Sequence, residues 1–132
     1  MPIKLQIRDR LIEVTFLGNI TGLDLQQQIE TLRDLESRLE VSPDRVTDLS
    51  AACDAELPAS DVVLFAEERD VAKLKNKIKS AIIAPSPIQY GLARMFMACN
   101  KNPAIEIRLF REASSAYDWI GHARPADGMP QA

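Results

Sequence analysis

The spacing of hydrophobic residues changes along this chain, from every second residue to every third or fourth and back again. In residues 3–8 and again in 12–16, apolar and polar side chains alternate, and Glu13 falls on the polar side. Such alternation is typical of strands with one buried face. Because only a short turn near Asp9 and Arg10 separates them, the two segments predict an antiparallel hairpin.

Residues 21–40 follow the helical spacing instead. Leucines and one isoleucine recur there every three or four residues and so line one face of a helix. Thr21 and Asp24 have the spacing of a capping box, in which each side chain bonds the other's backbone N–H. The pattern predicts an amphipathic helix that begins at Thr21.

Two further helices are predicted at 60–74 and 85–100. Ser60 and Ser86 stand in front of them, and serine is a favoured N-cap residue. Pro87 follows Ser86 at the first helical position, where proline is well tolerated. The apolar spacing of the second helix predicts a buried face made of Ile88, Leu92, Met95, Phe96 and Cys99.

The remaining segments complete an alternating order. Short apolar runs at 45–52, 80–84 and 104–110 predict strands, and 112–121 predicts a last helix. The order β-β-α-β-α-β-α-β-α indicates an α/β fold with largely parallel strands and right-handed crossovers. We expect one domain over residues 1–121, and the composition of 122–132 is typical of a flexible C-terminal tail.

Composition narrows the classes of function. The 132 residues include 46% hydrophobic and 27% charged residues, as in an ordinary globular protein. A net charge of -3 argues against a general nucleic-acid binder, which needs a basic face. No signal peptide or membrane span is evident in the sequence, so we expect a cytoplasmic protein. With two cysteines and one histidine, neither a metal site nor a cofactor is predicted.

Carboxylates after the third predicted strand are the one candidate for chemistry. Asp48 lies at the end of that strand, where ligands usually bind in α/β proteins, and Asp54 and Glu56 follow in the loop. A pair with separated pKa values could act as general acid and base. Sequence spacing does not show whether these carboxylates converge in a pocket, and it does not indicate which reaction they would catalyse. The prediction is therefore that the chain is not an enzyme.

Tyr90 and Arg94 lie four residues apart and off the apolar face of their predicted helix. Exposed tyrosine and arginine are enriched at protein interfaces, so the two could contact a partner. The alternative is an intrahelical contact in which the arginine lies over the tyrosine ring.

Three stretches carry a resemblance to a known family. They are "DLSAACDAELPASDVV", "AIIAPSPIQYGLARMFMACN" and the following "KNPAIEIRLFREASSAYDWI". Here the chain resembles the SpoIIAA-like STAS family, including its STAS/SEC14 branch, over nearly all of residues 3–120. The resemblance implies a mixed sheet of four to five strands flanked by about four helices, and a role without catalysis.

In that family, anti-sigma-factor antagonists bind a kinase that is also the anti-sigma factor. Phosphorylation of a serine in an Asp-Ser-Ser-Gly motif switches them off. Ser60 stands at the corresponding place, but Ala59 precedes it and Asp61 follows, so the motif is absent. The resemblance thus implies a regulatory module that binds a protein partner, without the phosphoserine switch of the family. Ser60 stays a candidate phosphoacceptor and the helix cap is its alternative role.

The candidate residues follow from these two lines of reasoning. The predicted partner is a kinase or an anti-sigma-type regulator, and the predicted contact residues are Asp54, Glu56, Ser60, Asp61, Tyr90 and Arg94. The SEC14 side of the resemblance implies an alternative function, a small carrier or sensor of an apolar or lipid-like ligand. Phe65, Met95 and Phe96 would line its cavity, although ordinary core packing also explains them. The strand at 104–110 could pair with a second copy in a homodimer.

Overall fold

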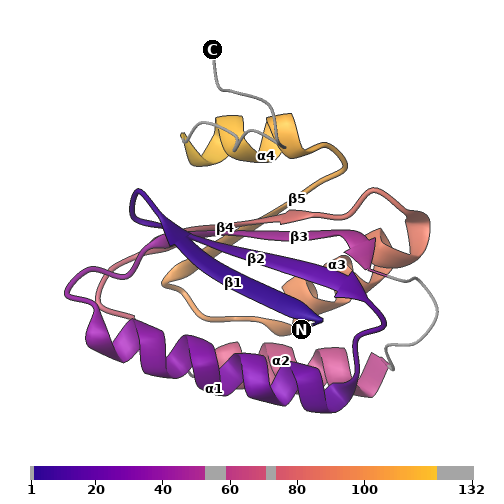
Figure 1. Ribbon diagram of the computed structural model, residues 1–132, viewed down its shortest axis with the longest axis horizontal. Helices are drawn as coiled ribbons and strands as arrows, with labels where there is room; N and C mark the ends of the chain where they lie inside the picture. Colours follow the sequence, from indigo (N-terminus) through magenta and orange to yellow (C-terminus); the bar gives the residue numbers. More distant parts are fainter. Residues whose placement is uncertain (1, 53–58, 71–73, 122–132) are drawn as a thin grey trace.

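The computed structural model describes residues 2–52, 59–70 and 74–121 (Figure 1). The predicted order of elements and the mixed sheet flanked by helices are confirmed. The strands are β1 (Ile3–Arg8), β2 (Leu11–Gly18), β3 (Asp44–Ala52), β4 (Ile78–Ile83) and β5 (Ile105–Phe110). The helices are α1 (Gly22–Arg38), α2 (Ala59–Asp70), α3 (Pro87–Cys99) and α4 (Ala113–Ile120). The predicted tail, 122–132, lies outside the described residues.

A tight turn joins β1 and β2 in the predicted antiparallel hairpin. Asp9 and Arg10 both have positive φ, at 50° and 64°, although neither is a glycine. Two successive residues of positive φ are characteristic of a type I′ turn, whose twist matches that of the strands. The turn pairs Arg8 with Leu11, and the register continues to the pairing of Ile3 with Phe16.

The five strands lie in the order β1-β2-β3-β4-β5, with only β1 antiparallel to its neighbour. Each crossover from β2 to β5 therefore moves one strand in the same direction across the sheet. Because such crossovers are right-handed, the helices that make them lie on one face. Figure 1 shows α1 and α2 on that face and α4, which follows the last strand, on the opposite face. We call these the crossover face and the α4 face.

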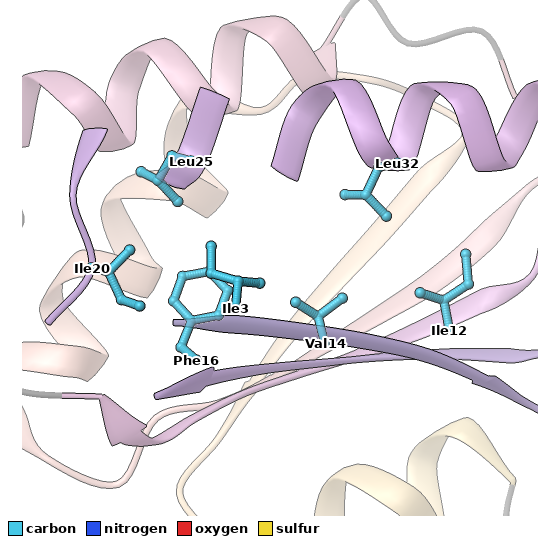
Figure 2. Close-up of a cluster of buried hydrophobic side chains, with 7 residues drawn as sticks. All are labelled: Ile3, Ile12, Val14, Phe16, Ile20, Leu25 and Leu32. Carbon is cyan, nitrogen blue, oxygen red and sulfur yellow. The ribbon is translucent and has the colours of Figure 1, made fainter. Parts of the chain in front are cut away.

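Alternating side chains of the central strands build a hydrophobic core on the crossover face. Leu25 and Leu32 point from α1 toward the sheet, where they face Val14 and Phe16 of β2 (Figure 2). Thr21 caps α1 as predicted: its side chain accepts from the Asp24 N–H, and the Asp24 carboxylate accepts from the Thr21 N–H. The cap fixes where the helix starts and hence which residues face the strands.

The α4 face carries a second core. Its buried residues are Leu11, Val46, Ala81 and Ile83 from the strands and Ala116, Tyr117 and Ile120 from α4. Glu13 was predicted on the polar side of its strand, but it is buried here. Glu13 can be buried because it has a hydrogen-bond partner: the Tyr117 hydroxyl donates to Glu13 Oε2 at 2.6 Å. A buried carboxylate is tolerated when hydrogen bonds of this kind satisfy it.

In α3 the structure corrects the predicted buried face. Ser86 caps the helix and forms a capping box with Gln89, with Pro87 at the first position as expected. Gln89 and Ala93 are the buried residues, whereas Ile88, predicted to be buried, is 52% exposed. The other four residues of the predicted face, Leu92, Met95, Phe96 and Cys99, are half-buried, so the prediction is wrong only at Ile88.

The start of α2 also differs from the prediction. The helix begins at Ala59, so Ser60 is an exposed residue of its first turn rather than the N-cap. Among the described helices, none combines the length and the apolar composition that crossing a bilayer requires.

Candidate functional site

A cavity of about 110 Å³ lies on the crossover face, between β2, β3 and β4 and the three crossover helices. Two of its lining side chains contact each other, since Phe65 of α2 and Phe96 of α3 have ring centroids 5.6 Å apart. The apolar wall consists of Val14, Phe16, Ile20, Leu25, Leu32, Leu49, Ala52, Val62, Phe65, Ile82, Leu92, Ala93 and Phe96. Figure 2 shows the part of this wall formed by α1 and β2.

Polar side chains interrupt the wall at a few places. They are Gln28 of α1, Arg45 and Thr47 of β3, Ser80 of β4 and Gln89 of α3. Alternation explains the strand residues: Arg45 and Thr47 lie two apart and so share one face, and Arg45 pairs in register with Ser80. The sheet therefore contributes a short polar strip to a cavity that is otherwise apolar.

The positive charge in the wall is neutralised within the protein. Arg45 Nη2 lies 2.7 Å from Glu36 Oε2, and both side chains are almost fully buried. Glu36 reaches this place because it follows Leu32 by one turn on the inward face of α1. A buried pair of this geometry contributes no net charge to the cavity.

The two glutamines of the wall differ in their bonding. Gln89 Nε2 donates to the Ala52 carbonyl at 3.1 Å, and Gln89 Oε1 accepts from the Ser86 N–H at 3.1 Å. Gln28 is just as buried, yet its Nε2 has no hydrogen-bond partner within the described part of the chain. Buried polar groups are normally satisfied, so this amide is an exception that calls for a reason.

The residues predicted to line a cavity are only partly in its wall. Phe65 and Phe96 line the cavity, whereas Met95 is half-buried and is not among the lining residues. The polar strip was missed altogether. In the sequence, Arg45, Thr47 and Ser80 look like ordinary surface residues, and only the register of β3 with β4 brings them together.

The predicted partner-contact residues within the described ranges are divided between α2 and α3. Asp54 and Glu56 lie outside the described residues, while Ser60 and Arg94 are exposed. Asp61 packs against the start of α1, where a Cβ added to Gly22 would come within 2.9 Å of its carboxylate. A carboxylate beside a helix N-terminus is favoured by the helix dipole, which gives Asp61 a structural role.

Tyr90 also has a different neighbour from the one expected. The guanidinium that lies over its ring, 4.4 Å from the centroid, belongs to Arg111 rather than to Arg94. Tyr90 is half-buried and packs against the core on the crossover face. Arg94 is left as the more accessible member of the predicted pair.

On the α4 face, titratable groups form a satisfied cluster rather than an open site. Arg8 Nε donates to Glu13 Oε1 at 3.0 Å, and Tyr117 bonds the other carboxylate oxygen. Burial by itself would raise the pKa of Glu13, but the bonds from Arg8 and Tyr117 outweigh it and lower the pKa. Burial, together with the bond to Glu13, raises the pKa of Tyr117. The cluster thus keeps Glu13 ionised and Tyr117 protonated, and it joins α4 to the sheet.

No other constellation for chemistry is evident in the described ranges. Within them, no three His, Cys, Asp or Glu side chains are grouped so that they could hold a metal ion. Asp48 lies within β3 rather than at its end, and it accepts a hydrogen bond from the N–H of Ser50 in the same strand at 2.9 Å.

The architecture defines an α/β protein with a mixed sheet, three crossover helices on one face and a final helix on the other. A solved structure shares it: an uncharacterized protein of the DUF3478 family from Shewanella loihica PV-4, described as having a SpoIIAA-like fold. The match has a TM-score of 0.59 at 17% identity and covers 89% of this chain and 91% of that one. The chain therefore has a SpoIIAA-like fold, as the resemblance implied. Neither a family model nor a curated protein matches the sequence.

Proposed function

We propose that this chain is a non-enzymatic binding protein that holds a small apolar molecule in the cavity of the crossover face, as a carrier or sensor. The observation that carries the proposal is the cavity itself, which is lined by Phe65 and Phe96 and is apolar over most of its wall. Protein interiors normally pack without voids of this size. Apolar pockets with a few placed polar groups are typical of ligand sites.

The size of the cavity refines the predicted ligand. An engineered cavity of about 150 Å³ lined by leucine, isoleucine and phenylalanine binds benzene. With about 110 Å³, the cavity on the crossover face suits a molecule of that scale or slightly smaller. A whole phospholipid would need a much larger space, so we narrow the proposed ligand from lipid-like to small and apolar.

The test is a titration with methylenecyclopentane, a hydrocarbon of about the size of benzene, followed by methyl NMR spectroscopy. We expect saturable shifts at Leu49, Ile82 and Leu92, which line the cavity. Methyl groups of Ile83 and Ile120 on the α4 face should stay unchanged. The absence of saturable shifts at the lining methyl groups would refute the proposal.

The matched variant is Ala93→Leu, which adds a larger side chain to the cavity wall. Ala93 is buried on α3, so its replacement should occupy the space and abolish the saturable shifts. Cavity filling commonly leaves a protein as stable or more stable, so loss of binding would not reflect unfolding. Undiminished binding by a folded Ala93→Leu variant would place the ligand elsewhere.

Partner binding through the outer surface of α2 and α3 is the second proposal. The observation that favours it is the exposure of apolar side chains there: Leu64 is 45% exposed on α2, and Ile88 and Met97 are exposed on α3. Leu64 follows the exposed Ser60 by one helical turn. Arg94 lies between Ile88 and Met97 on the exposed side of α3. Methionine and arginine are among the residues enriched at protein interfaces.

We expect the double variant Ile88→Asp, Arg94→Glu to lose a partner that the wild type captures in its own cell extract. Both side chains are exposed, so the variant should fold normally. Val41→Asp is the control, because Val41 is also an exposed apolar residue but lies outside α2 and α3. Equal capture by all three proteins would argue against this surface. Phosphopeptide mass spectrometry of protein from its native cell would show whether Ser60 carries a phosphate.

A further inference from the structure

The unpartnered amide of Gln28 indicates what kind of small molecule the cavity accepts. Gln28 is 6% exposed, and within the described residues no acceptor lies within hydrogen-bond reach of its Nε2. Leaving a buried amide N–H without an acceptor costs free energy, which a ligand atom can recover by accepting from it. Gln89, in the same wall, has no such need because both ends of its amide bond to the backbone.

Gln28 lies where a ligand would meet it. On α1 it falls between Leu25 and Leu32, which point toward the sheet in Figure 2 and line the cavity together with Gln28. Its surroundings in the wall are mainly apolar. A bound molecule should therefore be apolar over most of its surface and carry one polar atom at the position of Gln28.

The charge of that polar atom follows from Arg45 and Glu36. Arg45 is the charged residue among the lining side chains, and its guanidinium already lies 2.7 Å from the Glu36 carboxylate. Because this pair has no net charge, a ligand carboxylate would be buried without a compensating cation. Burying an uncompensated charge is strongly unfavourable, so the cavity should favour uncharged molecules.

We propose that the cavity selects a compact, uncharged and mainly apolar molecule with one hydrogen-bond acceptor, such as a ketone, aldehyde or ether oxygen, which accepts from Gln28 Nε2. The molecule has about six heavy atoms, as in benzene, by comparison with cavities that bind it. This inference rests on the proposed function, because it specifies the ligand of the same cavity.

The test compares two probes of nearly identical shape, cyclopentanone and methylenecyclopentane, which differ in a carbonyl oxygen against a CH₂ group. Each is titrated into the wild type and into Gln28→Met, which replaces the amide by an apolar chain of the same length. We expect the variant to bind cyclopentanone about tenfold more weakly, as befits the loss of one hydrogen bond. Its affinity for methylenecyclopentane should stay within about twofold, since that probe accepts no hydrogen bond.

The ratio of the two changes isolates the contribution of the amide, as in a double-mutant cycle. An equal change in affinity for both probes would overturn the inference. Gln89→Met is the matched control: Gln89 lies in the same wall but its amide bonds the protein, so its replacement should not discriminate between the probes. Gln28→Met also removes an unpaired polar group, so its thermal stability should equal or exceed that of the wild type.

A third probe tests the part of the inference that concerns charge. Butyrate has six heavy atoms and acceptor oxygens but is anionic at pH 7, so it should not displace methylenecyclopentane. Displacement as effective as that by cyclopentanone would contradict the selection of uncharged molecules. If neither cyclopentanone nor methylenecyclopentane binds the wild type, the proposed function itself fails. If both bind and Gln28→Met does not discriminate, only the present inference fails.

Discussion

Ala93 and Ala116 are buried alanines on helices that cover opposite faces of one sheet, and their surroundings differ. Ala93 borders the cavity of the crossover face. Ala116 lies in the core of the α4 face, among Leu11, Val46 and Tyr117. The polar groups differ in the same way, since the Tyr117 hydroxyl is bonded to Glu13 while the Gln28 amide has no partner within the described residues.

The difference shows how one face of a sheet can contribute stability while the other face provides a binding site. Leu11, Ala81 and Ala116 are fully buried, and Tyr117 bonds the sheet through Glu13, so α4 is firmly attached. On the crossover face, space and an unsatisfied donor are left between helices and sheet. Unfilled volume and unpaired polar groups reduce stability, and at ligand sites the bound molecule offsets that cost.

The largest expected effect concerns the buried ion pair beside the cavity. Glu36→Gln should lower the free energy of unfolding by about 3–5 kcal/mol, because it leaves the charge of Arg45 buried without its counter-ion. Denaturant unfolding measures this loss of free energy. Glu68→Gln is the matched control, since Glu68 forms an exposed pair with Arg33 and its replacement should cost less than about 1 kcal/mol. Similar losses in the two variants would show that the Arg45 site is open to solvent.

On the α4 face, Tyr117→Phe should lower the free energy of unfolding by about 1.5–3 kcal/mol, since it removes a buried hydrogen bond to the charged Glu13. Tyr90→Phe is the control, because Tyr90 is half-buried and its ring keeps the contact with Arg111. It should change stability by less than about 0.5 kcal/mol. A neutral Tyr117→Phe would mean that the bond does not hold α4 to the sheet.

Enlarging the two alanines tests the comparison between the faces directly. Ala116→Leu should be destabilising by about 1–3 kcal/mol, because a closed core has no room for the added atoms. Ala93→Leu should be neutral or stabilising by up to about 2 kcal/mol, because its side chain enters the cavity. Thermal or denaturant unfolding of the two variants measures these changes in stability. The opposite order of stabilities would contradict our description of an open crossover face and a filled α4 face.

The smallest expected effect is a difference in pH dependence. The pKa of Glu13 is lower in the folded state than its ordinary value of 4.5, so its contribution to stability is present above pH 4.5 and is lost as the pH falls through the folded pKa. The drop in unfolding free energy from pH 7 to pH 3 should therefore be larger in the wild type than in Glu13→Gln. Equal drops would mean that the bonds from Arg8 and Tyr117 do not favour the ionised form.

These effects also mark the limit of what the sequence predicts. Local signals were sufficient for the order of elements, for the capping box at Thr21 and for the N-cap at Ser86, because the groups involved lie within three residues. The burial of Glu13 was not predictable in this way, since Tyr117 is 104 residues away in the sequence. Charged residues at alternating positions of a strand ordinarily face solvent.

The cavity shows the same limit. Phe65 and Phe96, which line the cavity, were candidates because the SEC14 side of the resemblance implied an apolar ligand between helix and sheet. Gln28 and Arg45 gave no such signal, since polar residues in a helix or strand usually lie on the surface. Their place depends on the rotation of α1 against the sheet and on the register of β3 with β4, which are tertiary properties.

The most direct test of the account is the crystal structure of the protein under xenon pressure. Xenon enters apolar cavities that are large enough and leaves filled cores unoccupied. We predict an anomalous xenon peak on the crossover face, beside Phe65 and Phe96, and none between α4 and the sheet. A crossover face without xenon, or xenon beneath α4 instead, would contradict the account.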